Sequence, residues 1–434
     1  MYFIIFALIA AGGFTTDHDE NTTIVFPPYG HCMGIYRAGQ DQLSLLLGGM
    51  LQFDDPQGLA AVLPDAWDTS DPSDDDELAV YGVNSGSGHI IYNASMYTLG
   101  YYGGNGSGDD QLLSPHGIAA TTSGTVYVAD TGNHRVAVLH RSGQRLSPES
   151  FIEGFSEPWD VALDGRNIWV TDRAAGTLSR YTSASDMNPV VFQVDSPRGV
   201  AATGYGEYTD GHPACQVVIT GNGTVLTKLV DGSVVGTADL SSCGGSFFNY
   251  VELDYHGNVW VTDSIACRIH KFDPQLNYLD SWGDGYGEAD GSFLHPTGLA
   301  IWDRFGQIFV AESSGARYFW VGTDIKNLSF SSDGNGCSVS GRLTEKAAMV
   351  VNIYRSDGSL ARSLYSGRRA PGNFSLEWDG TTLQGRRVYR GEYTISINIE
   401  PVYSSRTYFD KTWTQEFHMD GQEEVEAPQG ERSR

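Results

Sequence analysis

Three residues of this chain have side chains suited to binding, and each directly follows a proline that begins a short apolar segment. They are His116, Trp159 and Arg198, in the phrases SPHGIAA, EPWDVAL and SPRGVAA. An imidazole can titrate or ligate a metal, an indole offers an aromatic platform, and a guanidinium can pair with a carboxylate. Corresponding positions in other copies of the phrase hold Gln57, Asn249 and Thr297. Because the backbone does not dictate these residues, the six form the candidate ligand-binding set.

A second set of polar residues closes a later apolar segment in five of the six copies. Its members are Asn84, Asp130, Asp172, Asp263 and Glu312. Paired carboxylates could assist glycoside hydrolysis. A structural role is also open to them, since each can cap the next turn or pair with a nearby arginine, as Asp130 could with Arg135. The repeat already accounts for these acids, so the sequence favours the structural role.

Both sets belong to a repeated unit. A Pro-x-Gly turn begins an apolar strand, and a glycine turn then leads into alternating valines such as Val126 and Val128. Alternation with a period of two is typical of a strand with one buried face. Clear copies span residues 114–139, 157–181, 248–272 and 295–321, and weaker copies begin at Asp55 and Ser196. Four antiparallel strands cannot bury both faces alone, so the six units are expected to stack radially into a closed ring.

The pattern P-x-G-[IVL]-A, then G-x-[VI]-[YWF]-V-[AT]-D, then x-R-[VI], resembles the NHL repeat. The linkers YGGNGSGDDQLLSPHG and WGDGYGEADGSFLHPTG resemble the inter-blade phrase of the same family. The resemblance implies an all-β fold, with a six-bladed β-propeller over residues 30–324. Residues Cys32–Arg37 and Gln42–Leu47 would supply the outer strand of the last blade. Both polar sets would then lie on one face, at the mouth of a central channel. There the candidate set either binds a ligand or merely fills the channel mouth.

A different pattern begins near Ile325. The phrase WDG…G…GEYTI is similar to the Ig-like domain of flagellar hook-capping (FlgD) proteins. The similarity implies a small β-sandwich over residues 325–418 that acts as a spacer or anchor. Residues 419–434 are rich in Glu, Gln and Arg, and we expect them to be disordered.

An enzymatic alternative also comes from the resemblance, because NHL proteins include peptidyl-hydroxyglycine amidating lyases. Those enzymes hold zinc with three histidines in the propeller channel. Only His116 occupies a matching post-proline position here, since His134 belongs to the ordinary repeat phrase and His295 precedes its proline. A metal-dependent lyase or hydrolase is therefore the alternative to a binding role, and the sequence indicates no zinc site.

An acidic insertion, DAWDTSDPSDDDE at residues 65–77, carries seven carboxylates. Calcium prefers such oxygen ligands. The spacing lacks the D-x-[DN]-x-[DN]-G pattern, so a solvated acidic loop is favoured and calcium remains the one cofactor to consider.

The five cysteines are odd in number and have no CxxC spacing, which argues against structural zinc. Cys243 and Cys267 are both expected at the channel-mouth face, whereas Cys215 should lie at the opposite face. If any disulfide forms, the topology favours Cys243–Cys267 over Cys215–Cys243.

The net charge of −26, from 53 acidic and 27 basic residues, repels phosphate backbones and argues against a nucleic-acid partner. Residues 2–11 are apolar and lead into small residues, so residues 1–13 are expected to be a signal peptide, although no Lys or Arg precedes the run. No other stretch approaches the ~20 apolar residues of a membrane span. We expect an exported, extracytoplasmic bacterial protein that binds a peptide, glycan or protein at the channel mouth.

Overall fold

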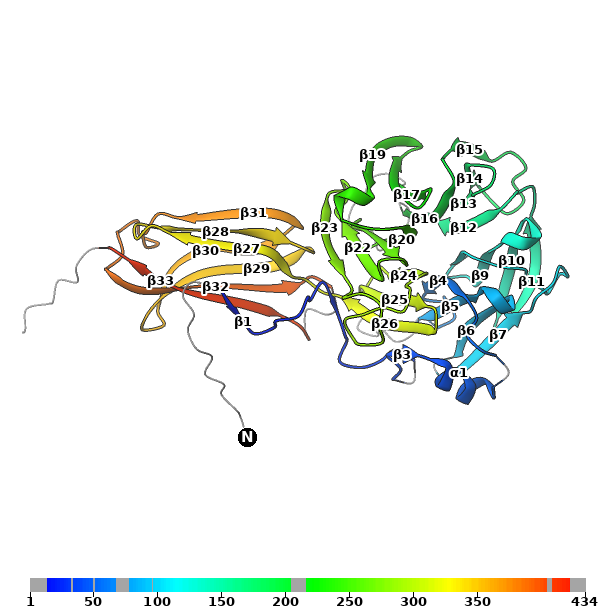
Figure 1. Cartoon of the computed structure of the whole chain (residues 1–434), viewed down its shortest axis with the longest axis horizontal. Helices are drawn as coiled ribbons and strands as arrows, with labels where there is room; N and C mark the ends of the chain where they lie inside the picture. Colours follow the sequence, from blue (N-terminus) through cyan, green and yellow to red (C-terminus); the bar gives the residue numbers. More distant parts are fainter. Residues whose placement is uncertain are drawn as a thin grey trace, which may run out of the picture. The chain divides into compact units, whose positions relative to one another are not determined.

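The computed structural model describes residues 14–32, 34–49, 51–67, 78–95, 97–203, 216–403 and 408–421. The chain forms two compact units (Figure 1). One unit is Ile24–Val321, and the other combines Met1–Thr23 with Gly322–Arg434. Strands dominate both units, in agreement with the predicted all-β class.

Within its described residues, the Ile24–Val321 unit contains six antiparallel sheets. Sheet one is β4 (Pro56–Val62), β5 (Ala79–Asn84), β6 (His89–Ser95) and β7 (Thr98–Gly103). Sheet two is β8 (Ile118–Ala120), β9 (Thr125–Asp130), β10 (Arg135–Ser142) and β11 (Arg145–Ile152). Sheet three is β12 (Pro158–Leu163), β13 (Ile168–Asp172), β14 (Thr177–Tyr181) and β15 (Val190–Gln193).

Sheets four to six follow the same order along the chain. Sheet four is β16 (Pro197–Thr203), β17 (Gln216–Gly221), β18 (Val225–Val230) and β19 (Ser233–Asp239). Sheet five is β20 (Phe248–Leu253), β21 (Val259–Asp263), β22 (Arg268–Phe272) and β23 (Tyr278–Trp282). Sheet six is β24 (Leu299–Trp302), β25 (Gln307–Glu312) and β26 (Gly315–Val321), and β26 also pairs with two short N-terminal strands.

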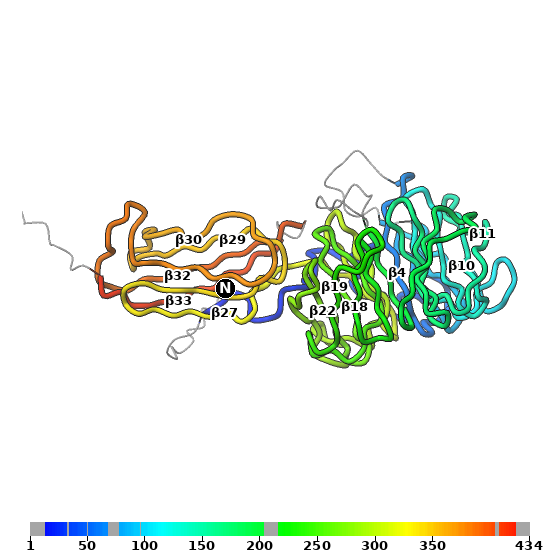
Figure 2. Tube along the Cα trace, turned by 90° about the horizontal axis from the view of Figure 1, so that it is seen from above, coloured from blue at the N-terminus to red at the C-terminus, as the bar shows by residue number. Residues whose placement is uncertain are grey.

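The first strands of the six sheets contact one another in a closed order. Each of β4, β8, β12, β16 and β20 contacts the first strand of the next sheet, and β24 contacts β4 again. In Figures 1 and 2, β4 lies towards the middle of the unit. Apolar side chains of neighbouring sheets pack together, as Val126 and Val128 of β9 do with Ile90 and Tyr92 of β6. The order of contacts closes on itself.

Threonine side chains join four consecutive sheet boundaries. The Oγ1 atoms of Thr131, Thr171, Thr220 and Thr262 donate to the carbonyls of Pro158, Arg198, Asn249 and Thr297, at distances of 2.6, 2.6, 2.9 and 2.7 Å. In each case the acceptor belongs to the Pro-x-Gly region of the following sheet.

Two further contacts close the ring. Thr297 Oγ1 donates to the carbonyl of Pro56 (2.7 Å), which links sheet six to sheet one. The amide of Gly58 donates to the carbonyl of His116 (3.0 Å), which links sheet one to sheet two. A side-chain or backbone hydrogen bond therefore crosses every boundary between neighbouring sheets.

The glycine of the Pro-x-Gly phrase is required by this close approach of neighbouring sheets. A Cβ at Gly58 would lie 2.7 Å from the carbonyl oxygen of His116, and one at Gly199 would lie 2.6 Å from that of Asn249. A Cβ at Gly298 would overlap the carbonyl oxygen of Gln57. Only glycine fits such a site without moving the neighbouring backbone.

The N-terminal segment pairs with sheet six through two strands, β2 (Ile24–Val25) and β3 (Arg37–Ala38), which both lie against β26. The prediction that Gln42–Leu47 forms a strand is wrong, because Gln40–Leu47 is helix α1. Leu43 and Leu47 are four residues apart and bury the same face of this helix with Leu51.

The second unit contains two sheets in its described residues. One has the order β1 (Thr15–Thr16), β33 (Lys411–Met419), β32 (Gly391–Pro401), β29 (Ala347–Arg355) and β30 (Leu360–Arg369). The other has β27 (Ile325–Ser332), β28 (Cys337–Leu343) and β31 (Gly372–Trp378). Their common core includes Val339, Met349, Trp378 and Ile397. The sequence did not predict that Thr15–Thr16 would join this unit.

Two predicted segments fall outside the described residues, namely the signal peptide at 1–13 and all but the start of the 419–434 tail. Among the described residues, no helix has the length and hydropathy needed to cross a membrane.

Candidate ligand-binding site

Three of the six candidate residues meet at one end of the inner strands. The rings of His116 and Trp159 lie 3.8 Å apart between centroids, with their planes at 33°. The guanidinium carbon of Arg198 lies 4.7 Å from the centroid of the Trp159 ring, and that of Arg173 lies 4.1 Å from it. We call His116, Trp159, Arg173 and Arg198 the mouth cluster. Sheets two, three and four contribute to it.

Trp159 supports this cluster rather than presenting an open aromatic platform, which was the expectation from the sequence. Its side chain is only 8% exposed, because the imidazole and two guanidinium groups pack against it. Its indole Nε1–H is buried and has no hydrogen-bond partner among the described residues. Such a donor is usually paired in a protein interior. The ring therefore orients two cations and keeps one unpaired N–H beside them.

The two arginines differ in their electrostatic surroundings. Arg173 is paired with Glu157, and its Nε donates to Glu157 Oε2 at 2.9 Å. Arg198 is half-buried between the rings of Trp159 and Phe247, and no described carboxylate forms an ion pair with it. Burial, followed by the neighbouring charge of Arg173, lowers the pKa of Arg198, but a guanidinium remains protonated. Arg198 is therefore a cation that can accept an anionic partner.

His116 is neutral over the physiological range. Burial is the main cause that lowers its pKa, to about 4, and the nearby charges of Arg173 and Arg198 act in the same direction. Its Nδ1 lies 3.0 Å from both the carbonyl of Ser114 and the hydroxyl of Thr131. The sequence suggested a titrating group here, whereas the structure holds the ring as an uncharged packing partner of Trp159.

The other three candidates have different contacts, and Asn249 lies beside Gly199 of sheet four. Gln57 donates to Asp55 Oδ1 (2.7 Å), and its Oε1 accepts from the hydroxyl of Tyr250 (3.3 Å). Thr297 uses its hydroxyl to join sheets six and one, and the carbonyl of Asn249 accepts from Thr220. Thr297 therefore has a structural role, and Gln57 is held in a buried polar contact.

The five residues of the second set share one structural role. Each accepts a hydrogen bond from a backbone amide of the linker that precedes its sheet's first strand or of the turn beside it. These bonds are Asp54 N to Asn84, Leu113 N to Asp130, Ser156 N to Asp172, Ser246 N to Asp263 and Leu294 N to Glu312. Asp130 also pairs with Arg135 at 2.8 Å, as predicted. The structural interpretation of this set is confirmed.

Several buried polar residues near the axis were missed by the sequence reasoning. Asp160 and Tyr250 occupy positions where other copies have the glycine of Pro-x-Gly. The carboxyl of Asp160 accepts from the amides of Val161 and Val200, and burial raises its pKa to about 8. Burial likewise raises the pKa of Glu252 to about 8 and that of Asp303 well above its usual range. The replacement of the repeat glycine by Asp160 and by Tyr250 was the sequence signal that could have revealed this group.

The sequence analysis also missed Arg173, although a comparison of the repeat copies singles it out. The residue after the closing acid is Thr131, Ser264 or Ser313 in other copies, whereas sheet three has Arg173. An arginine in place of a small hydroxyl residue marks the sheet at which the mouth cluster forms.

No group of three or more His, Cys, Asp and Glu side chains is arranged to hold a metal ion in the part of the chain that the structure describes. The histidine set of the lyase alternative is therefore absent from that part. Most of the acidic insertion, residues 68–77, lies outside the described residues, so calcium binding there stays a prediction.

The predicted Cys243–Cys267 disulfide is not formed, since both residues are free thiols. Cys267 Sγ lies 3.7 Å from the carbonyl of Ser264 and 3.8 Å from Nδ1 of His295. Cys243 Sγ instead contacts the carbonyl of Leu240 at 3.6 Å. The two thiols are thus held by different turns. Cys215 lies outside the described residues.

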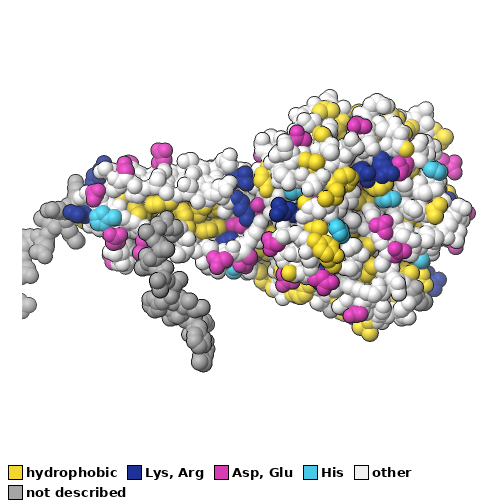
Figure 3. Space-filling view, viewed as in Figure 1, with side chains coloured by type: hydrophobic (Ala, Val, Ile, Leu, Met, Phe, Trp, Pro, Cys, Tyr) yellow, Lys and Arg dark blue, Asp and Glu magenta, His cyan; other side chains and the backbone are white. Residues whose placement is uncertain are grey.

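Figure 3 shows how charged side chains are distributed on one face of the molecule. Lys and Arg side chains occur there in small groups among acidic and apolar side chains. The absence of a nucleic-acid partner stays a prediction, which rests on the net charge of −26.

Comparison with known proteins identifies two modules. A model of the NHL repeat matches residues 112–139, and a model of the FlgD Ig-like domain matches residues 326–400. The chain therefore contains one segment that matches the NHL repeat and another that matches the FlgD Ig-like domain. It is 25% identical to mouse NHL repeat-containing protein 3 over 201 residues, which make up 40% of this chain and 56% of the mouse protein. The chain thus spans little more than half the length of that relative.

Two enzymes are among the similar solved structures. Virginiamycin B lyase from Staphylococcus aureus has a TM-score of 0.41 and 13% identity, covering 56% of this chain and 76% of the lyase. A gluconolactonase from Xanthomonas campestris has a TM-score of 0.44 and 12% identity, covering 68% of this chain and 98% of the lactonase. Likeness at this level does not extend to a shared activity.

Proposed function

We propose that the Ile24–Val321 unit is a six-bladed β-propeller that binds a ligand at the mouth of its channel. The closed order of first strands and the hydrogen bonds across every sheet boundary support this architecture. The mouth cluster is the binding site. The observation that carries the proposal is the guanidinium of Arg198, which forms no ion pair with a described carboxylate and packs on the ring of Trp159, whose indole N–H has no partner among the described residues.

The chemistry of this cluster favours a ligand with a carboxylate. Arg198 offers several N–H donors in a planar fork, which matches the two oxygens of a carboxylate. The ring of Trp159 packs against this guanidinium, and its own N–H is buried without a partner among the described residues. Acidic peptides, protein segments and glycans that contain uronic acids have this group. The protein thus acts as a binding or scaffold protein.

The second unit is proposed to be an Ig-like β-sandwich that serves as a spacer or anchor. Its two sheets enclose one apolar core, and its sequence matches the FlgD Ig-like domain. The apolar run at residues 2–11 supports export, so the site is proposed to act outside the cytoplasm, in the periplasm, at the cell surface or after secretion.

The test is the substitution Arg198→Gln, which removes the charge and keeps much of the side-chain volume. A panel of short acidic peptides and uronic-acid oligosaccharides is titrated by calorimetry. The best ligand should bind the variant about tenfold more weakly or worse, since a hydrogen bond to a charged group contributes roughly 1.5–3 kcal/mol.

The matched control is Arg180→Gln, because Arg180 also lies over a tryptophan, at 5.6 Å from the ring of Trp169. This variant should bind the ligand as the wild type does. Equal losses in both variants, or none in Arg198→Gln, would exclude the mouth cluster as the site.

A further inference from the structure

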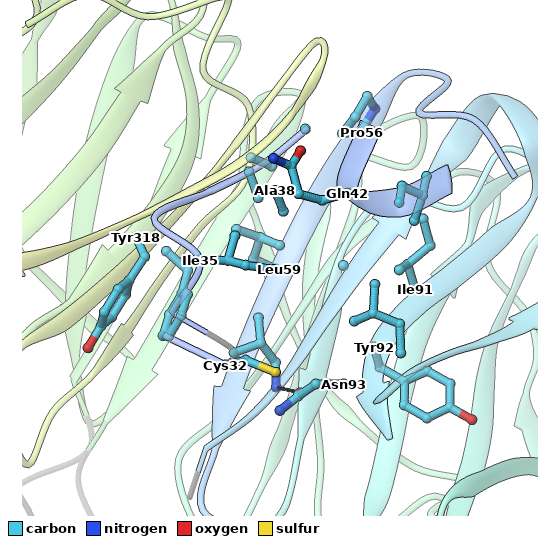
Figure 4. A pocket seen from close by; sticks show the side chains of 18 of the residues that line it. Cys32, Ile35, Ala38, Gln42, Pro56, Leu59, Ile91, Tyr92, Asn93 and Tyr318 are labelled. Carbon is cyan, nitrogen blue, oxygen red and sulfur yellow. Dashed lines mark hydrogen bonds between the residues drawn. The ribbon is translucent and has the colours of Figure 1, made fainter. Parts of the chain in front are cut away.

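A cavity of about 160 Å³ lies between sheets one and six, where the N-terminal segment completes the ring of sheets (Figure 4). Strands β4 to β7 line one side, β25 and β26 line the other, and the segment with β3 and α1 contributes the rest. We call it the seam cavity. Its walls are apolar almost throughout, and small residues, namely Ala38, Gly82, Ala311 and Ala316, leave the space.

One lining side chain does not fit an apolar role. The imidazole of His31 is 7% exposed and packs against the rings of Phe309 and Tyr318, at 5.0 and 5.3 Å between centroids. Among the described residues, neither Nδ1 nor Nε2 has a hydrogen-bond partner, and no other lining residue has a buried side-chain polar atom left unpaired. Burying a polar group without a partner is unfavourable, so each such group calls for an explanation.

The other polar side chains of the cavity already have partners. Asn93 donates to the carbonyl of Leu78 and accepts from the amide of Val80. Asn84 donates to the carbonyl of Gln52, and Gln42 accepts from the amide of Gly39. Burial lowers the pKa of His31 to about 4, so its ring is neutral and offers one donor and one acceptor.

We propose that the seam cavity binds a small apolar molecule, the size of one aromatic ring or of a short aliphatic chain, with one hydroxyl or carbonyl group that hydrogen-bonds to His31. The volume fits such a ligand, since apolar cavities of about 150 Å³ hold benzene. The apolar walls disfavour charged ligands, because Arg317, the charged side chain among the described lining residues, is already paired with Glu312. This site is separate from the mouth cluster and uses no residue of it.

The experiment compares two probes that differ by one hydroxyl group, toluene and p-cresol, by saturation-transfer NMR and by the shift in melting temperature. Both should bind the whole protein, and p-cresol should bind about fivefold more tightly because of its hydrogen bond to His31. His31→Phe should keep toluene binding and abolish the preference for p-cresol. His140→Phe, at an exposed position on β10, should retain the preference.

Variants that fill the seam cavity test whether the probes bind there. Ala316→Leu should abolish binding of both probes, and Ala38→Leu, at another lining position, serves if the first variant does not fold. Absence of binding by the wild type at millimolar probe would overturn the proposal. Unchanged binding in a folded filling variant, or an unchanged preference in His31→Phe, would overturn it as well.

Discussion

The mouth cluster and the seam cavity are built from the same repeated sheets but differ in their polar groups. In the mouth cluster, charged and aromatic side chains from three consecutive sheets pack on one indole. In the seam cavity, apolar side chains surround a single neutral imidazole. The mouth cluster lies where every sheet repeats the same phrase, so that residues not required by the backbone can vary. The seam cavity lies where the repeat is interrupted by an N-terminal segment containing a helix.

This difference shows how a repeat can carry two kinds of site. Where the phrase repeats, its backbone forms the ring of hydrogen bonds, and function depends on the residue that follows the proline. Where the repeat is completed by another segment, small residues on both sides leave a cavity that this segment helps to line. The substitutions below test each half of the comparison, from the largest expected effect to the smallest.

Gly298→Val should have the largest effect, because its side chain would overlap the carbonyl oxygen of Gln57 in the neighbouring sheet. We expect a loss of about 4 kcal/mol or more in the free energy of unfolding, or failure to fold. Gly236→Val on β19 is the control, since the nearest atom to its Cβ is 3.8 Å away. Urea unfolding measures both. Similar stability of the two variants would contradict the close approach of sheets six and one.

His31→Phe tests the seam cavity through pH. The pKa of His31 is lowered to about 4 by burial, so its contribution to stability is present above pH 6.5 and is lost as the pH falls to 4. The loss amounts to roughly 3 kcal/mol in the wild type and is absent from the variant.

Unfolding free energies of wild type, His31→Phe and His140→Phe between pH 4 and 7 give the comparison, because other groups contribute equally to all three. A slope that is the same in His31→Phe and in the wild type would show that this imidazole protonates freely in the native protein.

Thr171→Val removes one bond of the ring and leaves the carbonyl of Arg198 without its donor. The expected loss is about 2 kcal/mol, because Thr171 is fully buried and the carbonyl loses its donor. Thr237→Val, at an exposed position of β19, should change stability by less than about 0.5 kcal/mol. Thermal and urea unfolding measure both variants, and equal losses would show that the ring bond adds nothing.

The smallest effect is expected for Trp159→Phe, because the indole N–H of Trp159 has no partner to lose. The free energy of unfolding of this variant should fall by about 1 kcal/mol or less. Trp169→Phe should cost about 2 kcal/mol, since that indole donates to Asp164 at 2.8 Å. A larger loss of unfolding free energy in Trp159→Phe than in Trp169→Phe would show that the N–H of Trp159 has a structural partner.

Much of the ring could be predicted from the sequence, because the phrase around Pro115, Pro158 and Pro197 sets both the start of a strand and the side on which the next residue lies. The contact of His116, Trp159 and Arg198 followed from that register. The roles of Asp130 and Arg135 followed as well, since they lie five residues apart across one turn.

The rest depended on how much space each side chain has. Arg173 packs on Trp159 and helps to bury it, and this residue is informative only once sheet three is aligned with its neighbours. The pKa of His116 is lowered mainly by burial, which the sequence alone does not show. The seam cavity combines α1 with Gly82 and Ala316, which are far apart in the chain. The helix itself was missed because four leucines in Gln42–Leu47 fit a strand as well as a helix until Leu51 shows which face is buried.

The most direct test of the proposed binding site is the indole region of a ¹⁵N–¹H spectrum recorded while the best carboxylate ligand is added. The Trp159 signal is assigned by its absence from Trp159→Phe. We predict that this signal moves on titration in the wild type and stays in place in Arg198→Gln at the same ligand concentration. Saturating binding during which the Trp159 signal does not move, while other indole signals do, would place the ligand elsewhere and contradict the proposal.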